Sequence, residues 1–123
     1  DKGLAMLIGE VVKSIDPLLP IMCLAGSQMI NVLESIGLKA MPESFADRTY
    51  EPDGTLRKRS YSNALIDIPQ IASKQAYNIY YNKRIIAHEG SEFSIDSKTI
   101  CIHSDTENAL KIAKAVKQKL IRS

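Results

Sequence analysis

Helical and extended patterns alternate over the first part of the chain, and this order restricts the fold more than any other feature. Residues 2–15 carry apolar side chains at helical spacing, which predicts an amphipathic helix with one apolar face. The apolar run 20–24 predicts a buried strand, residues 28–36 a second helix, and residues 38–41 a second strand. This alternation is typical of an α/β fold built on a parallel sheet or barrel.

A long polar segment, residues 42–62, follows this alternation. It is aperiodic, and its Pro52-Asp53-Gly54 sequence is typical of a turn, because proline presets φ and glycine tolerates positive φ. Loops of about twenty residues are uncommon in compact domains unless they are functional or disordered. Because the segment lacks the composition of a linker, we predict a functional loop.

Regular patterns return in the second half of the chain. They predict a helix over residues 68–82, a small hairpin over residues 84–88 and 93–95, and a buried strand over residues 99–103. Ser104 and Glu107 have the spacing of a capping box, so the last helix is predicted to begin there. Its expected inner face consists of Leu110, Ile112, Ala113, Val116 and Leu120.

Length and composition limit the function classes. A chain of 123 residues is one small domain or one piece of a larger one. The net charge is +2, without the concentrated basic face of a nucleic-acid-binding module. No apolar run approaches the roughly 20 residues of a membrane helix, and no secretion leader is present. We therefore expect a cytoplasmic protein that binds neither nucleic acid nor membrane.

Cys23 and Cys101 each lie inside an apolar run. Unpaired cysteine is among the most buried residue types, so both are predicted to be buried packing thiols rather than a disulfide. Neither belongs to a Cys-x-x-Cys pair, which disfavours zinc. The sequence therefore predicts no metal-ligating residues in this chain.

Charged side chains follow the predicted second strand. Ligands of parallel α/β folds bind at the carboxyl ends of strands, where Glu43, Asp47 and Arg48 lie. Arg48 would clamp the carboxylate of a small acid there. The structural alternative is an Asp47–Arg48 salt bridge beside a solvated Glu43. The same segment holds Tyr50, Asp53 and Arg59, which also suit turn or surface positions.

A histidine ends the last predicted strand. Histidine accepts and returns a proton near neutral pH, and the position of His103 matches the catalytic rim of a barrel. Ser104 and Asp105 are explained by the start of the following helix, but His103 is not. His88, beside Glu89 in the predicted hairpin, is expected to be structural.

Two stretches resemble sequence blocks of one known family. Residues 43–60, Glu-Ser-Phe-Ala-Asp-Arg-Thr-Tyr-Glu-Pro-Asp-Gly-Thr-Leu-Arg-Lys-Arg-Ser, resemble its block Glu-x-Phe-Ala-Asp-Arg-x-Tyr-x-x-Asp-Gly-x-Leu-x-x-Arg. Residues 99–106, Thr-Ile-Cys-Ile-His-Ser-Asp-Thr, resemble its block Thr-Ile-Cys-Val-His-Gly-Asp-Thr. The chain thus resembles, nearly end to end, the LamB/YcsF family, which is the family of the prokaryotic 5-oxoprolinase A subunit.

The resemblance implies a seven-stranded, irregular β/α barrel of the glycoside hydrolase/deacetylase type. It also implies ATP-dependent hydrolytic opening of the lactam 5-oxo-L-proline to L-glutamate, together with separate B and C subunits. ATP would bind to this polypeptide or to its partner subunits, and the identity of any metal stays open.

The resemblance also implies site residues by motif position. The catalytic set would be Glu43, Asp47, His103 and Asp105; the substrate-binding set would be Arg48, Tyr50 and Arg59; Asp53 also matches a motif position. As a hypothesis, Arg48 holds the substrate carboxylate, and Glu43 or Asp47 orients water or a metal-bound group. His103, oriented by Asp105, would then pass a proton to the leaving amide nitrogen.

The chain also departs from the family. It resembles only the C-terminal half of the family's longer proteins and begins at Asp1 without an initiator methionine, so we expect an inactive segment of a longer protein. Ser104 stands where the family block has glycine. Half of a closed barrel exposes two strand edges. We therefore expect a fragment, a homo-oligomer that covers these edges, or a poorly soluble chain.

Two other functions stay open at this point. The chain could be a non-catalytic barrel remnant that binds a partner subunit, which the absence of the family's upstream motifs favours. Fold analogy alone suggests a metal-dependent carbohydrate deacetylase. Intact charged residues in the segment 42–62, together with His103, favour the enzyme.

Overall fold

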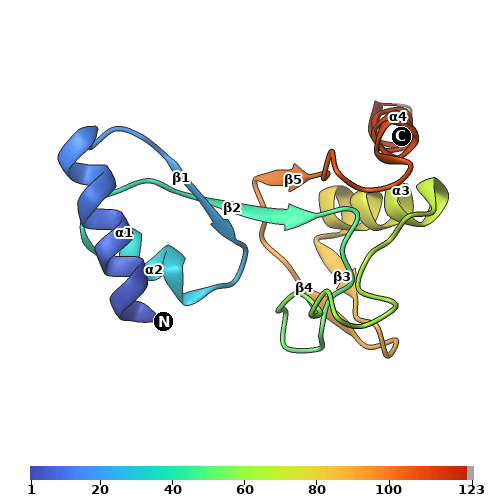
Figure 1. Ribbon diagram of the computed structural model, residues 1–123, viewed down its shortest axis with the longest axis horizontal. Coiled ribbons are helices and arrows are strands. Elements are labelled where there is room, and N and C mark those ends of the chain that lie inside the picture. The colour runs from blue at the N-terminus through green and yellow to red at the C-terminus, as the bar shows by residue number, and fades with distance from the viewer. Residues whose placement is uncertain (122–123) are drawn as a thin grey trace. The chain divides into compact units, whose positions relative to one another are not determined.

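The computed structural model describes residues 1–121 and has an α/β fold with a parallel sheet (Figure 1). The elements in chain order are α1 (Lys2–Ile15), β1 (Ile21–Leu24), α2 (Gln28–Ser35), β2 (Ala40–Phe45), α3 (Pro69–Tyr77), the π-helix η1 (Asn78–Asn82), β3 (Arg84–Ile86), β4 (Glu92–Ser94), β5 (Thr99–Cys101) and α4 (Ala109–Ile121). One sheet has the strand order β1-β2-β5, and β3 pairs with β4 in an antiparallel hairpin. Every helix within the described residues is too short or too polar to cross a lipid bilayer.

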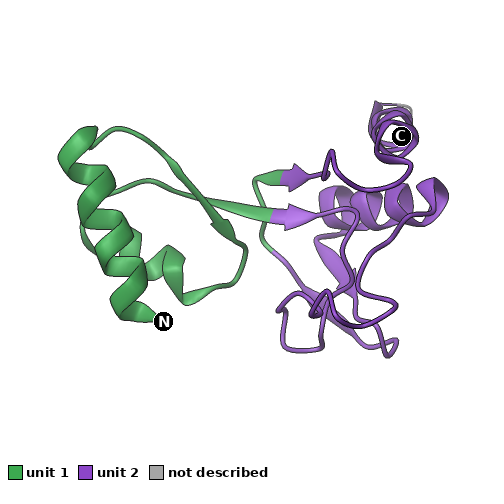
Figure 2. Ribbon diagram, in the orientation of Figure 1, with its two compact units in different colours: residues 1–43, 96–99 green, residues 44–95, 100–123 purple. Residues whose placement is uncertain are grey.

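The chain divides into two compact units, which Figure 2 shows in different colours. Among the described residues, the first consists of residues 1–43 and 96–99, and the second of residues 44–95 and 100–121. In the first unit β1 and β2 are parallel, with Ile21 opposite Ala40 and Leu24 opposite Glu43. The predicted α/β alternation is therefore confirmed for the first part of the chain.

Helix α1 packs on α2 through its small residues. Its N-cap is Asp1, whose carboxylate accepts hydrogen bonds from the backbone nitrogens of the first turn. Ala5 and Gly9 are buried, and a Cβ atom on Gly9 would lie 2.6 Å from Cδ1 of Ile36. The small residues Ala5 and Gly9 thus face α2, and the apolar face noted in the sequence points away from it. Its exposed members are Leu4, Leu7, Ile8, Val11 and Ile15.

The core of the first unit consists of Cys23, Leu33 and Leu38. Burial raises the pKa of the Cys23 thiol above its ordinary value. Neither cysteine forms a disulfide, as predicted, although Cys101 is only half-buried. The expected packing role is therefore confirmed for Cys23 and holds only in part for Cys101.

In the second unit α3 packs against α4 over a core of small and branched side chains. The buried members of this core are Ala46, Ala72, Ala76, Ile112 and Val116. The alanines allow the residue after β2 and the two helices to approach closely, while Ile112 and Val116 fill the space between them. The predicted inner face of α4 is confirmed at these two positions and wrong at Leu110, which is exposed.

Three predicted boundaries are wrong. Strand β5 covers residues 99–101 rather than 99–103, so His103 follows the strand instead of ending it. Strand β2 covers residues 40–45 rather than 38–41, so residues 42–45 of the expected loop are strand, and Glu43 lies in β2. The apolar pattern does not reveal this strand, because its buried position 44 is occupied by the polar residue Ser44, which is fully buried. Helix α4 begins at Ala109, after Asn108 at a φ of 64°, so Ser104 and Glu107 do not form the predicted capping box. The predicted helix 68–82 is confirmed as α3 followed by η1.

Candidate functional site

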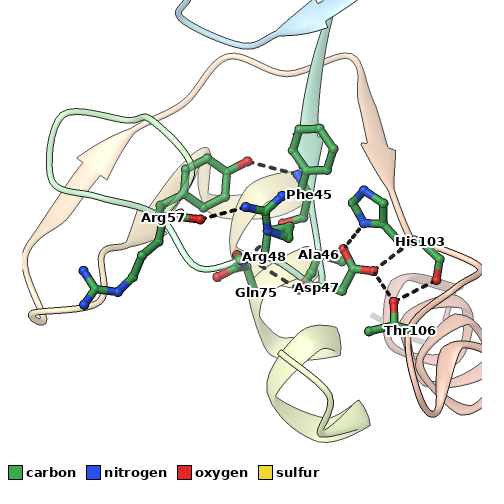
Figure 3. Close-up of polar contacts among 9 residues, drawn as sticks. Phe45, Ala46, Asp47, Arg48, Arg57, Gln75, His103 and Thr106 are labelled. Atoms are coloured by element: carbon green, nitrogen blue, oxygen red, sulfur yellow. Dashed lines mark hydrogen bonds and ion pairs between the residues drawn. The ribbon is translucent and has the colours of Figure 1, made fainter. Parts of the chain in front are cut away.

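The bend directly after β2 carries a buried carboxylate that binds one histidine twice. Oδ2 of Asp47 accepts a hydrogen bond from the backbone nitrogen of His103 at 2.7 Å, and Oδ1 lies 2.9 Å from Nδ1 of the same residue (Figure 3). The hydroxyl of Thr106 donates to the His103 carbonyl at 3.0 Å and lies 3.5 Å from Oδ2 of Asp47. Asp47 therefore ties the bend after β2 to the residues after β5.

The geometry fixes how His103 can act. An ionised carboxylate only accepts hydrogen bonds, so Asp47 selects the imidazole tautomer with the proton on Nδ1 and the lone pair on Nε2. The ring of Phe45 stacks on the imidazole, with the ring centroids 5.5 Å apart and an angle of 11° between the ring planes. This stacking restrains the plane of the imidazole. The side chain of His103 is 24% exposed, whereas that of Asp47 is 1% exposed. The pair therefore presents a positioned, accessible proton acceptor.

Gln75 of α3 holds the bend that carries Asp47. Its amide Nε2 donates to the carbonyls of Phe45 and Arg48, both at 2.8 Å, and lies 3.4 Å from that of Ala46. These carbonyls flank Asp47 in the chain, so the amide restrains the backbone on both sides of the carboxylate. Sequence reasoning missed Gln75. The available signal was a polar side chain on the inner, alanine-rich side of the predicted helix.

Arg48 follows Asp47 and is more than nine-tenths buried. One guanidinium nitrogen donates to the carbonyl of Arg57 at 2.7 Å, but the buried Nε has no hydrogen-bond partner. Burial and then the positive charge of Arg59 lower the pKa of Arg48 below its ordinary value. A buried cation with a free donor, near a second cation, is suited to bind an anion.

The salt bridge that the sequence suggested as an alternative does not form. Both oxygens of Asp47 face His103, and no salt bridge within residues 1–121 joins Arg48 to a carboxylate. The carboxylate nonetheless lies close enough to Arg48 to oppose part of the lowering of its pKa. Asp47 and Arg48 thus serve different partners although they are adjacent in the chain.

Internal contacts order the loop after this bend. Glu51 bridges Arg57 and Nε2 of His88, each at 2.9 Å, so the structural role expected for His88 is supported. The predicted turn is confirmed, since Gly54 has a φ of +86°. Within it the hydroxyl and then the backbone nitrogen of Thr55 donate to Asp53, which lowers the pKa of that carboxyl.

The remaining predicted site residues lie as follows. Tyr50 is fully buried, and its hydroxyl accepts a hydrogen bond from the Phe45 backbone nitrogen at 3.0 Å, which favours a structural role. Glu43 is half-buried on β2 in the first unit. Arg59 and Asp105 are exposed. The carboxylate that orients His103 is that of Asp47 rather than Asp105, because the turn after β5 leaves Asp105 in solvent.

Clustered metal ligands and a phosphate-binding loop are the features that a metal or a nucleotide would require. Within residues 1–121 no group of three or more His, Cys, Asp or Glu side chains is arranged to hold a metal ion. The turn at Gly26 and Ser27 before α2 is the nearest counterpart of a phosphate loop, but two residues are too few to surround a phosphate.

Residues 1–123 match the family model described as LamB/YcsF family. The 5-oxoprolinase A subunit from Tolumonas auensis is 42% identical over 123 residues, which cover 100% of this chain and 49% of the relative. The 5-oxoprolinase A subunit from Halalkalibacterium halodurans is 39% identical over 120 residues, which cover 98% of this chain and 47% of the relative. The crystal structure of the lactam utilization protein from Thermus thermophilus matches with a TM-score of 0.89 and 31% identity, over 99% of this chain and 48% of that one. The chain therefore spans about half the length of the proteins it matches.

Proposed function

The chain belongs to the LamB/YcsF family, and we propose from this premise that it supplies part of the hydrolytic site of a 5-oxoprolinase A subunit. The observation that carries the proposal is the Asp47–His103 pair, a buried carboxylate that orients a partly exposed imidazole. In the proposed reaction, water adds to the lactam carbonyl of 5-oxo-L-proline and the ring C–N bond breaks. The nitrogen takes up a proton, which gives L-glutamate.

His103 has the proton-transfer role in this proposal. Nε2 takes a proton from the attacking water and returns one to the leaving nitrogen, while Nδ1 keeps its proton toward Asp47. Asp47 is a positioning residue, because both of its oxygens are engaged by His103. Its carboxylate also stabilises the imidazolium that forms when Nε2 is protonated.

Arg48 and Arg59 would hold the substrate carboxylate. Arg48 offers a buried nitrogen without a partner, and Arg59 places a second positive charge near it. An incoming carboxylate would satisfy the free donor and relieve the repulsion between the two cations. The two arginines would therefore orient the lactam through the only charged group of 5-oxoproline.

The rest of the assembly is proposed by relationship. The relatives are named for one subunit of 5-oxoprolinase, which supports a multi-subunit enzyme. B and C subunits would be the partners, and ATP would supply the driving force. The full-length fold would be the seven-stranded, irregular barrel that the motifs imply, in a cytoplasmic protein. No step of the proposed chemistry passes through ATP or a metal held by this chain.

The test uses a chimera in which this chain replaces the 123 matched residues of the Tolumonas auensis protein. Together with the B and C subunits of that organism, it should hydrolyse ATP in a 5-oxoproline-dependent manner. His103→Ala should abolish this turnover in a folded protein, whereas the exposed control Glu107→Gln should retain it. Arg59→Gln should raise KM for 5-oxoproline more than it lowers kcat. Full turnover in the His103→Ala variant would remove His103 from the mechanism.

A second candidate function is a non-catalytic remnant that binds a partner subunit. The exposed apolar side chains of α1, among them Leu7 and Ile15, favour this function because they could contact such a partner. A chimera that folds and assembles with the B and C subunits but has no turnover would support this function over the first.

A further inference from the structure

Helix α4 has a second face, opposite the side that packs on α3. The packed side carries the buried residues Ile112 and Val116. The residues of the opposite face recur at spacings of four, three and four, which places them on one side of a helix. This α4 face consists of Leu110, Lys114, Lys117 and Ile121. Leu110 and Ile121 are 68% and 69% exposed, and both lysines are exposed as well. The face therefore places two lysines between two exposed apolar side chains.

The positive charge of α4 is not balanced within the chain. The helix contains four lysines and no aspartate or glutamate. Lys111, Lys114 and Lys117 follow one another at a spacing of three, and like charges that are neighbours on a helix repel each other. In the described part of the chain, none of the salt bridges includes Lys114 or Lys117. A partner that brings carboxylates to the α4 face would relieve this repulsion.

The lysines also restrict what can cover the face. Lysine is almost never fully buried without a partner, so the face does not suit an apolar surface of its own fold. A second copy of the chain would place lysine against lysine. A helix that lies on a lipid surface needs a continuous apolar side, which both lysines interrupt here. The net charge of +2 is too small for binding along a nucleic-acid backbone. The partner that remains is a protein surface with carboxylates beside apolar side chains.

We propose that the α4 face docks an acidic surface of a B or C subunit. This docking rests on the proposed function, which supplies those partners, and the relatives are named for one subunit of 5-oxoprolinase. Leu110 and Ile121 make the apolar contacts at the two ends of the face, and Lys114 and Lys117 pair with carboxylates between them. Because these charges lie at a surface, added salt weakens the complex.

The first measurement is the affinity of the tagged chimera for the purified B and C subunits of Tolumonas auensis. Lys114→Glu/Lys117→Glu should raise Kd about tenfold or more at low salt and make Kd less dependent on salt. The matched control Lys39→Glu/Lys74→Glu makes the same change of charge at two exposed lysines elsewhere, and it should leave Kd within about twofold. Both variants should keep the urea midpoint of the chimera within about 0.3 M, since only exposed side chains change. Equal Kd values for the two variants would overturn the proposal.

The second measurement locates the contact without a substitution. Acetylation of lysine amines is followed by mass spectrometry in the chimera alone and in its mixture with the B and C subunits. Lys114 and Lys117 should react in the chimera alone and be protected in the mixture, whereas Lys39 and Lys74 should react in both. Protection in the chimera alone would overturn the proposal, because the same polypeptide would then cover the face. A homodimer of the chimera, or its binding to phosphatidylglycerol vesicles, would also overturn it if Lys114→Glu/Lys117→Glu removed that association.

The His103→Ala chimera separates docking from hydrolysis. Its Kd for the B and C subunits should equal that of the unaltered chimera, because His103 lies outside the α4 face. A complex that depends on Lys114 and Lys117 but has no turnover would support docking while the proposed hydrolysis fails. Turnover in a complex that leaves both lysines reactive would overturn docking and leave the proposed hydrolysis standing.

Discussion

Asp47 contacts His103 at two points, through the imidazole Nδ1 at 2.9 Å and through the backbone nitrogen at 2.7 Å. One carboxylate thereby sets both the orientation of the ring and the position of the backbone that carries it. Because Asp47 is fully buried, water cannot replace either contact when the carboxylate is altered.

Asp47→Asn tests this double contact at nearly constant volume. Asparagine keeps one acceptor oxygen but turns an NH₂ donor toward one of the two His103 donors, so one buried hydrogen bond is lost. We expect the free energy of unfolding to fall by about 2–3 kcal/mol, measured by urea denaturation. The neighbouring control Asp105→Asn, at an exposed carboxylate, should change it by less than about 0.5 kcal/mol. If Asp47→Asn and Asp105→Asn had the same urea denaturation midpoint, the structural role of Asp47 would be contradicted.

The amide of Gln75 gives a second prediction. Gln75→Leu removes the donor that two carbonyls flanking Asp47 share at 2.8 Å, so the free energy of unfolding should fall by about 1–3 kcal/mol. Hydrogen exchange at the Ala46 backbone nitrogen, which donates to Cys101 at 3.1 Å, should accelerate as the bend loosens. Gln70→Leu is the matched control, since Gln70 is exposed on the same helix. Unchanged exchange at Ala46 in Gln75→Leu would show that the amide does not restrain the bend.

The sequence predicted the order of the elements because their apolar patterns are local. It also brought Asp47, Arg48 and His103 forward as candidates through the two motif blocks. It did not predict that His103 pairs with Asp47 rather than Asp105, because that contact joins residues far apart in the chain. A neighbour in sequence was the simpler choice, and the turn after β5 excludes it.

The errors in the predicted packing have a common cause. An apolar stripe on a helix predicts burial, but the approach of Gly9 to Ile36 selects the small residues of α1 for contact with α2. The polar residue Ser44 similarly conceals the end of β2, although its side chain is fully buried. Both outcomes depend on the space that neighbouring elements leave, which no local pattern contains.

The core between α3 and α4 gives a third prediction, with a control on the same helix. Ile112→Ala removes a fully buried side chain and leaves a cavity beside Ala72 and Ala76, so the free energy of unfolding should fall by about 2–5 kcal/mol. Leu110→Ala removes an equally large side chain, but Leu110 is 68% exposed. This variant should lower the free energy of unfolding by less than about 0.5 kcal/mol. Urea denaturation of both variants measures the difference. A comparable cost at the two positions would contradict the packing of α4 on α3.

The turn at Asp53 gives a prediction of pH dependence. The hydroxyl of Thr55 is the largest cause of the lowered pKa of Asp53, so Thr55→Val should raise this pKa toward its ordinary value. The folded pKa lies below the unfolded one. The contribution of Asp53 to stability is therefore complete above the unfolded pKa and is lost as the pH falls through the folded pKa.

Nuclear magnetic resonance titration of the Asp53 carboxyl carbon measures the shift directly. Thr49→Val removes another hydroxyl of the same loop, which donates to the carbonyl of Asn63 at 2.6 Å, and it should leave the pKa of Asp53 unchanged. The difference in stability that the Thr55 hydroxyl produces through Asp53 should be present near neutral pH and vanish once Asp53 is protonated in both folded and unfolded chains. A pKa that stays lowered in Thr55→Val would assign the shift to the backbone nitrogen of residue 55, which the substitution retains.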